Sequence, residues 1–174
     1  MKRAIALLEK HNLLKIIDDE LDINLEIPHI AYIEVKKPVS KAILFTNVVD
    51  RKKNKKFKEP VLMNVFCNED AVKLFIGDGD KIGSEIESLL KLKPPVTFSE
   101  KLSTLGKLFS LKNTIPKKLN KKGECQEVIK LGADAKLSDL PVLTTWEEDG
   151  GPFITMGQAY TQSLNGELKH FGLY

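Results

Sequence analysis

Apolar residues recur every three or four positions in four segments of the first half of the chain. This spacing puts them on one face of a helix, and it predicts helices over residues 2–12, 26–37, 71–76 and 81–92. Asp22 and Asn24, shortly before the second segment, are candidates for its N-cap. Gly77 is a stop signal after the third segment. The pattern therefore predicts a framework of amphipathic helices.

Mainly apolar segments of strand length lie between these helices. Residues 42–49 and 60–66 predict two β-strands, because such short runs are typical of buried strands. The stretch that joins them, 51–58, holds six Lys and Arg side chains. We expect it to be a solvated hairpin loop, since runs of surface charge usually stay in water.

The later part of the chain reads as strands and turns. Strands are predicted at 124–129 and 153–162, with a turn between them that leads into a proline. Asn165-Gly166 then predicts a tight reversal with positive φ at both positions, and 168–174 its return strand. Because this strand runs to the last residue, we expect the chain to be cut inside a sheet.

A lysine-rich stretch separates the two parts. Residues 99–111 predict a helix, and the connector that follows it, 113–122, predicts a domain boundary. We therefore expect a mixed α/β fold with an N-terminal α/β domain over 1–118 and a second domain over 119–174.

Composition excludes several classes of protein. The 174 residues are 42% hydrophobic and 29% charged, which is unlike disordered or fibrous chains. No apolar run approaches the roughly 18 residues of a membrane span, and charge interrupts the apolar positions at the start, unlike in a signal peptide. We expect a cytoplasmic protein. Cys67 and Cys125 lie far apart without metal-ligand spacing, which predicts two buried free thiols.

Charge is distributed unevenly along the chain. Residues 1–122 hold 24 basic and 16 acidic side chains, whereas 123–174 hold 3 basic and 8 acidic ones. The excess of basic side chains in residues 1–122 comes from the segment 51–58 and from the acid-free stretch 101–122. Only Phe57 is interleaved with the first tract, which is poor for stacking on bases, so nucleic-acid binding is not favoured.

Two short motifs could carry chemistry, and each has a simpler interpretation. The glycines from Gly77 to Gly83 have the spacing GxGxxxG after a helix, which favours a helix-to-helix turn over a phosphate-binding loop. Glu147, Glu148 and Asp149 could serve acid/base or metal chemistry, but acids before two glycines favour a solvated turn. No Ser or Cys has the context of a nucleophile elbow.

Of the three histidines, His170 is the candidate for a ligand site. His11 and His29 lie near predicted helices, where packing or surface roles are favoured. On the return strand, alternation puts His170, Gly172 and Tyr174 on one face. An imidazole next to a glycine that permits close approach could line a ligand site, although spacing alone does not require it.

The order of several segments resembles the N-terminal part of the UbiD-type decarboxylases. The resemblance covers nearly the whole chain, and each segment is weak alone. The matching segments, in the order of that family, are Leu14–Asp22, Leu25–Ile27, Ala42–Val48, Pro60–Phe66, Asp139–Leu143, Asp149–Thr155 and His170–Tyr174.

The resemblance implies a fold and a cofactor site. In this family an N-terminal α/β domain precedes a split β-barrel that binds prenylated FMN, and a C-terminal domain mediates oligomerisation. By the family's motif, Leu173 and Tyr174 would contact the cofactor. His170 stands where the family has an Asn that helps to bind Mn²⁺, with K⁺ as a second ion. Imidazole is a softer ligand than an amide oxygen, which puts metal binding by His170 in doubt.

The resemblance also implies an activity for the intact protein. It is reversible non-oxidative decarboxylation of an aromatic or unsaturated carboxylic acid, in ubiquinone or menaquinone biosynthesis. A flavin prenyltransferase would supply the cofactor, and the enzyme would be a homo-oligomer. The arginine expected after Tyr174 and two later glutamates lie outside this sequence. We therefore expect the 174-residue chain to be inactive by itself.

Two other classes of function stay open at this point. The basic tracts could make the chain a non-catalytic binding module for RNA or anionic phosphates, whose affinity would fall steeply with salt. The unpaired strands at the end could instead make it an interaction domain that pairs with partner chains.

Overall fold

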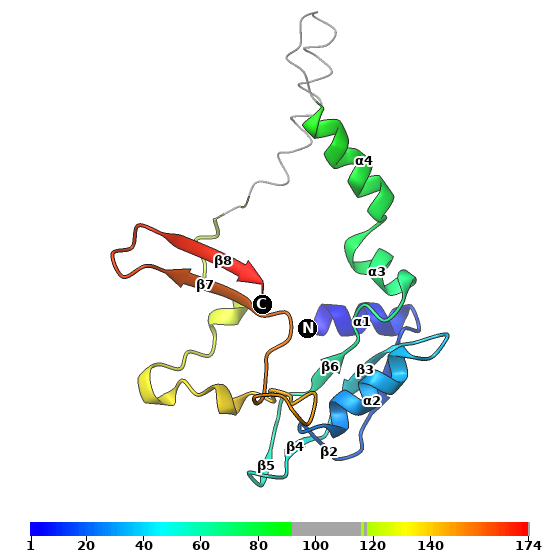
Figure 1. Cartoon of the computed structure of the whole chain (residues 1–174), viewed down its shortest axis with the longest axis vertical. Coiled ribbons are helices and arrows are strands. Elements are labelled where there is room, and N and C mark those ends of the chain that lie inside the picture. The colour runs from blue at the N-terminus through cyan, green and yellow to red at the C-terminus, as the bar shows by residue number, and fades with distance from the viewer. Residues whose placement is uncertain (92–115, 117, 174) are drawn as a thin grey trace, which may run out of the picture. The chain divides into compact units, whose positions relative to one another are not determined.

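A computed structural model of the chain describes residues 1–91, 116 and 118–173, which form a mixed α/β fold with small sheets (Figure 1). The residues group into two compact units, Met1–Ile76 with Lys136–Tyr174, and Gly77–Ala135. The helices and strands, in chain order, are α1 (Lys2–Lys10), β1 (Leu14–Ile17), β2 (Leu21–Asp22), α2 (Glu26–Val35), β3 (Ala42–Phe45), β4 (Val48–Asp50), β5 (Lys55–Lys56), β6 (Val61–Met63), α3 (Glu69–Ile76), α4 (Gly79–Leu90), β7 (Gln158–Gln162) and β8 (Lys169–Leu173).

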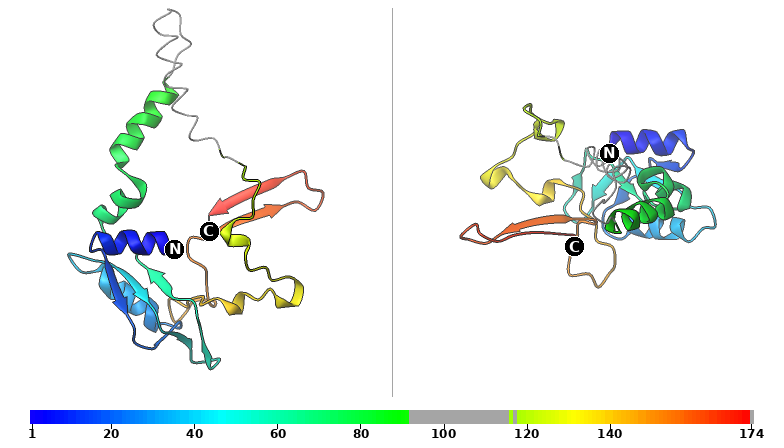
Figure 2. Two further views of the ribbon diagram at one scale, coloured as in Figure 1. Left: turned by 180° about the vertical axis from the view of Figure 1, so that it is seen from behind. Right: turned by 90° about the horizontal axis from the view of Figure 1, so that it is seen from above.

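The first sheet has the order β1-β3-β6. Strand β1 pairs with β3 in parallel, and β6 pairs with β3 in the antiparallel direction. All four residues of β3 are buried, because side chains that alternate across a strand meet apolar partners on both faces. Ile43 and Phe45 pack with Ile27 of α2, whereas Ala42 and Leu44 point to the opposite face. Figures 1 and 2 show α1 and α2 on opposite sides of this strand.

The second sheet differs from the hairpin that the sequence predicted. The predicted strand 42–49 is split, because β4 leaves the first sheet and pairs with β2 in parallel and with β5 in the antiparallel direction. The expected solvated loop over 51–58 therefore contains a strand. The sheet gains a further edge where Asn24 pairs in parallel with Thr144, a residue from far along the chain.

One apolar core joins the two sheets and α2. Its largest members are fully buried, and Leu143 contributes to it from the later part of the chain with 6% of its surface exposed. The buried members of the core are Ile23, Ile27, Ile43, Phe45, Val48, Phe57, Val61 and Leu143.

Helix α2 begins without the predicted side-chain cap. Its N-cap position is Leu25, which has a φ of 70° and no capping side chain. The carboxylate of Asp22 instead accepts hydrogen bonds from the backbone and side-chain amides of Asn24, at 2.9 and 3.0 Å. The two predicted capping residues therefore bind each other, and the prediction of a cap was wrong.

Helices α3 and α4 agree with the sequence pattern. Asn68 caps α3 by accepting the N–H of Ala71 at 2.9 Å, and Gly77 ends it with a φ of 98°. Asp78 then caps α4 by accepting the N–H groups of Asp80 and Lys81. The predicted helix-to-helix turn is therefore present but is confined to Gly77 and Asp78, and Gly79 and Gly83 lie in α4.

The predictions for 99–129 have two outcomes. The predicted helix at 99–111 and most of the lysine-rich connector lie outside the described residues. The strand predicted over 124–129 is wrong, since Glu124–Gln126 form a 3₁₀ turn and no strand is assigned there. Its apolar residues Val128 and Ile129 are exposed, so no sheet holds this segment extended.

The end of the chain is a two-stranded hairpin. The predicted long strand 153–162 is interrupted, because Phe153 forms an isolated bridge with Leu143 and Met156 has a φ of 55° before β7 begins. The reversal to β8 occurs as predicted, but only Gly166 has a positive φ, of 74°. Asn165 instead uses its side chain, which accepts a hydrogen bond from Ser163 and donates one to Glu167.

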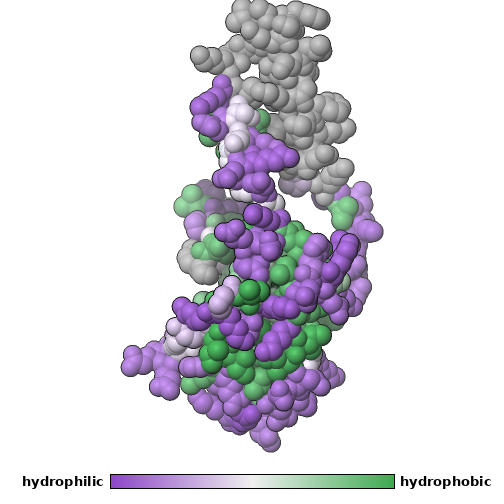
Figure 3. Space-filling model, turned by 90° about the vertical axis from the view of Figure 1, so that its right-hand side faces the viewer, coloured by the Kyte–Doolittle hydropathy of each residue, from purple (hydrophilic) through white to green (hydrophobic). Residues whose placement is uncertain are grey.

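No sheet of the described residues closes into a barrel. No helix in the described part of the chain is long and apolar enough to cross a membrane. Figure 3 shows that apolar side chains gather on one face of the molecule within a border of polar ones. The division of the chain at residue 118 stays a prediction.

Candidate functional site

The β7–β8 hairpin carries the residues that the sequence singled out. His170 lies opposite Thr161, and Gly172 lies opposite Ala159. Paired residues of antiparallel strands point to the same face, so His170 shares its face with a glycine and an alanine. These small residues leave room for a group to approach the strand beside the imidazole. Tyr174, the other residue expected on this face, lies outside the described residues.

The opposite face of the hairpin carries large apolar and aromatic side chains beside Gln158, Gln162 and Lys169. Tyr160 pairs with Phe171, and Leu173 lies on the same face because side chains alternate along a strand. The three side chains are 58–68% exposed. The structure thus places His170 and Leu173 on different faces of β8, and the expected cofactor contact of Leu173 stays a prediction.

The described residues do not by themselves fit a metal ion. His170 is exposed, and its imidazole is one potential donor. Within 1–91, 116 and 118–173, however, no group of three His, Cys, Asp or Glu side chains is close enough to hold a metal. A metal site that includes His170 would need further donors from elsewhere.

The acidic stretch before the two glycines has a structural role. One carboxylate oxygen of Asp149 accepts the N–H groups of Thr145 and Trp146, at 3.1 and 2.9 Å. This fixes the turn, as the simpler interpretation predicted. Glu147 and Glu148 remain exposed on its surface.

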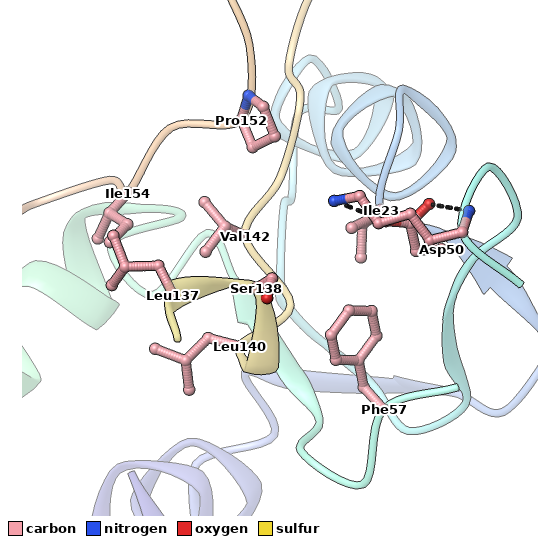
Figure 4. A pocket seen from close by; sticks show the side chains of 10 residues that line it. Ile23, Asp50, Phe57, Leu137, Ser138, Leu140, Val142, Pro152 and Ile154 are labelled. Atoms are coloured by element: carbon pink, nitrogen blue, oxygen red, sulfur yellow. Dashed lines mark hydrogen bonds and ion pairs between the residues drawn. The ribbon is translucent and has the colours of Figure 1, made fainter. Parts of the chain in front are cut away.

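An apolar pocket of about 440 Å³ was not predicted from the sequence. It lies between the second sheet and the segment 137–154, and Figure 4 shows Ile23 and Phe57 on one side of it and Leu137, Leu140 and Val142 on the other. The signal in the sequence that could have revealed this pocket is the presence of apolar side chains in the otherwise polar turn at 137–140.

Ionic contacts hold the walls of this pocket. The ammonium of Lys55 donates to the carbonyl of Ser138 at 2.6 Å and lies 3.4 Å from the carboxylate of Asp139. Asp50, 3% exposed, pairs with the ammonium of Lys53 at 3.4 Å. Because these charges are already paired, the pocket presents a mainly apolar interior.

Most of the basic tract is paired with acids. Besides Lys53 and Lys55, the guanidinium of Arg51 donates to Glu26, and Lys56 lies 3.8 Å from Glu20. The N–H of Asp22 and then Arg51 lower the pKa of Glu26, and Glu26 raises the pKa of Arg51. The basic tract 51–58 therefore links the second sheet to α2. These ion pairs weaken the case for an RNA-binding patch.

Neither the described thiol nor the remaining histidines form a catalytic group. Cys67 is a free, half-buried thiol, and burial raises its pKa, which makes it a poor nucleophile. The side chain of Cys125 lies outside the described residues. His29 packs against the ring of Tyr32, in line with its predicted packing role.

Comparison with known proteins shows which family the sequence of this chain matches. Residues 5–90 match the N-terminal domain of 3-octaprenyl-4-hydroxybenzoate carboxy-lyase, and residues 117–174 match its Rift-related domain.

Three long relatives match as well. Uncharacterised proteins of two Helicobacter pylori strains are 42% identical over all of this chain, which spans 29% of their length. One from Aquifex aeolicus is 36% identical over 82% of this chain, and the match spans 32% of that protein. Two family domains in tandem cover most of the residues, in the order that the sequence segments predicted. The chain belongs to the UbiD family of carboxy-lyases.

Proposed function

We propose that the intact protein decarboxylates an aromatic or unsaturated carboxylic acid with prenylated FMN as cofactor. The observation that carries this proposal is the pair of family domains, which ends on the strand that bears His170 and Leu173. When bound, prenylated FMN supplies an electron sink for the charge left by departing CO₂. The described residues would contribute a strand to its binding domain, the start of a split β-barrel.

The substrate proposal follows from the family description. It names a 4-hydroxybenzoate with a prenyl chain, which is an aromatic acid. We propose an acid of this class, in the synthesis of a quinone, for the intact protein. Supply of the cofactor by a flavin prenyltransferase, and Mn²⁺ bound with help from His170, belong to the same proposal.

The test uses the intact protein, produced with and without a flavin prenyltransferase. Purified protein should retain a modified flavin only with the transferase, and should then release CO₂ from a member of a panel of aromatic and α,β-unsaturated acids. Absence of both flavin and CO₂ release would contradict the proposal. Residues 1–174 alone should release none, since they lack the expected arginine and glutamates.

His170 provides a more specific test. His170→Asn places an amide oxygen at the family's position and should keep the manganese and flavin content of the intact protein within about twofold. His170→Ala removes the donor and should lower both by about tenfold, within the range known for changes near metal ligands. Thr161→Ala, on the paired strand, is the control. Equal metal and flavin content in all variants would show that His170 binds neither.

A binding module for RNA or anionic phosphates is the weaker candidate. Four basic side chains of its first tract have acidic partners, and the second tract lies mostly outside the described residues.

A further inference from the structure

The function proposed above leaves the apolar pocket without a role. Ile23 and Phe57, both at most 6% exposed, form one of its walls, and Val142 lies on the other (Figure 4). Its volume is about 440 Å³. Small-molecule sites are typically concave, mainly apolar and roughly 300–1,000 Å³ in size. The apolar pocket therefore has the size and the walls of a ligand site.

The charged groups that line the pocket favour an uncharged occupant. The carboxylate of Asp50 accepts the N–H of Lys53 at 3.1 Å and lies 3.4 Å from the ammonium of the same residue. A ligand carboxylate inside the pocket would meet this buried anion, and a ligand cation would compete with Lys53 for it. Because a buried charge without a partner is costly, these walls select an apolar group.

The apolar wall continues from the interior of the pocket to its mouth. Leu137, Leu140 and Ile154 line the pocket and are 71%, 50% and 49% exposed. A second apolar cavity, of about 200 Å³, shares Leu140, Val142 and Ile154 with the first. Apolar surface that extends beyond a single cavity suits an elongated ligand, one end of which is enclosed while the rest leaves through the mouth.

The volume of the pocket sets the length of chain that it can enclose. A water molecule takes about 30 Å³ in the liquid, and a carbon atom with its hydrogens takes a similar space, so the pocket holds roughly fifteen carbon atoms. Fifteen carbon atoms make three isoprene units. The substrate class proposed above carries a chain of such units, which is apolar, elongated and uncharged. The walls and the size of the pocket thus both fit a prenyl chain.

We infer that the apolar pocket binds about three isoprene units of a prenyl chain carried by the substrate, an inference that rests on the proposed function. Burial of the chain against Ile23, Phe57 and Val142 supplies the binding energy. Asp50 repels the substrate's carboxylate, so the acid end stays outside the pocket. Any further isoprene units leave through the mouth past Leu137 and Ile154.

The first test measures the binding of radiolabelled farnesol, an alcohol of three isoprene units, to the intact protein by equilibrium dialysis. Ser138 lines the pocket and is itself exposed, so Ser138→Phe fills the pocket from a position that tolerates a larger side chain. It should weaken binding by about tenfold or more, because the chain loses buried apolar area. Ser138→Ala is the matched control and should bind as the wild type does.

A second pair of variants changes the polarity of the wall instead of its volume. Leu140→Asn should weaken farnesol binding by about tenfold. Leu131→Asn, at a 77% exposed leucine that does not line the pocket, is its control. Dodecan-1-ol has a main chain of the same length as farnesol without the methyl branches, and it should bind more weakly because it buries fewer apolar atoms. Thermal unfolding verifies that each variant remains folded.

Decarboxylation kinetics of the intact protein separate this inference from the proposed function. KM should fall by about tenfold with each isoprene unit on the acid up to three units, and Ser138→Phe should remove this dependence without changing kcat for the unprenylated acid. Failure to bind farnesol, equal binding by Ser138→Phe, or equal binding of dodecan-1-ol would overturn the inference. Release of CO₂ from unprenylated acids without farnesol binding would leave only the proposed function standing, and farnesol binding without CO₂ release would leave only the prenyl site.

Discussion

Among the described residues, three carboxylates are almost fully buried, and each has donors within reach. Asp22, Glu34 and Asp50 are 3–7% exposed. Asn24, Lys37 and Lys53 respectively donate to them or pair with them. A buried carboxylate without a donor would be strongly destabilising, so these partners explain how the three residues are tolerated in the interior. Their role is to hold the fold, and none of them lies on the β7–β8 hairpin.

Glu34 gives this role a pH dependence. The hydrogen bond from Lys37 lowers the pKa of Glu34 below its ordinary value, against the effect of burial, which raises it. A carboxyl whose folded pKa is lowered stabilises the fold above its unfolded pKa, and this contribution is lost as the pH falls through the folded value. Glu34→Gln should therefore lower the free energy of unfolding by about 1–2 kcal/mol at pH 7.

Urea unfolding of both proteins at pH 7 and at pH 3 checks this expectation. The difference between them should shrink at pH 3, which is below the ordinary pKa of a glutamate, because the stabilisation by the charged carboxyl is lost as the pH falls. Glu87→Gln is the control, because Glu87 also pairs with a lysine but is exposed. A difference that is the same at both pH values would mean that packing, not charge, makes Glu34 important.

At the scale of elements, helices were predicted well because their signals are local. The caps Asn68 and Asp78 and the stop at Gly77 lie within a few residues of the helices that they bound. Strands were predicted less well. The segment 42–49 was predicted as one strand, but its two polar residues, Thr46 and Asn47, lie at the point between Phe45 and Val48 where the chain passes from one sheet to the other.

Asn68 links α3 to the segment before β3, and its two contacts can be separated. Its side-chain oxygen caps α3, while its amide donates to the carbonyl of Ser40 at 2.9 Å. Asn68→Ala should cost about 1–2 kcal/mol of unfolding free energy, since it loses both contacts. Asn68→Asp keeps the cap and should cost less, which chemical denaturation can measure. Equal losses would show that the bond to Ser40 dominates.

Lys55 ties β5 to the turn that forms one wall of the apolar pocket. Lys55→Met removes its contacts with Ser138 and Asp139 while keeping an apolar stem. Because the ion pair is partly exposed, stability should fall by less than about 1 kcal/mol. Hydrogen exchange around residues 137–140 should nevertheless become faster. Lys52→Met, in the adjacent turn, is the control, and equal exchange in the two variants would rule out this tie.

At the scale of the whole molecule, the contacts that close the fold were the ones that the sequence concealed. Thr144 hydrogen-bonds Asn24 across 120 positions, and Leu143 completes the apolar core. No periodicity reports a pairing at that separation. For the same reason the strand that bears His170 could be predicted from its neighbours, whereas the pocket and the contact between Tyr32 and Trp146, which combine distant segments, could not.

The late segment should therefore matter for the stability of the early one. A chain that ends at residue 118 lacks Leu143, whose burial alone stabilises by about 2 kcal/mol. It should unfold at a lower urea concentration than a chain that ends at residue 156, which keeps the bridges of Thr144 and Phe153. The two midpoints test this directly. Equal midpoints would mean that residues 143–153 add nothing to the core.

The bridge between Asn24 and Thr144 also has a consequence during synthesis. A ribosome adds about 5–20 residues per second, so the edge at Ile23 to Leu25 waits roughly 6–24 s before its partner is translated. During that interval a nascent chain exposes unpaired amide and carbonyl groups beside a half-built core, which is the kind of edge that aggregates. Chaperones that bind short extended segments would find their target there, and slow codons between the two partners would lengthen the exposure.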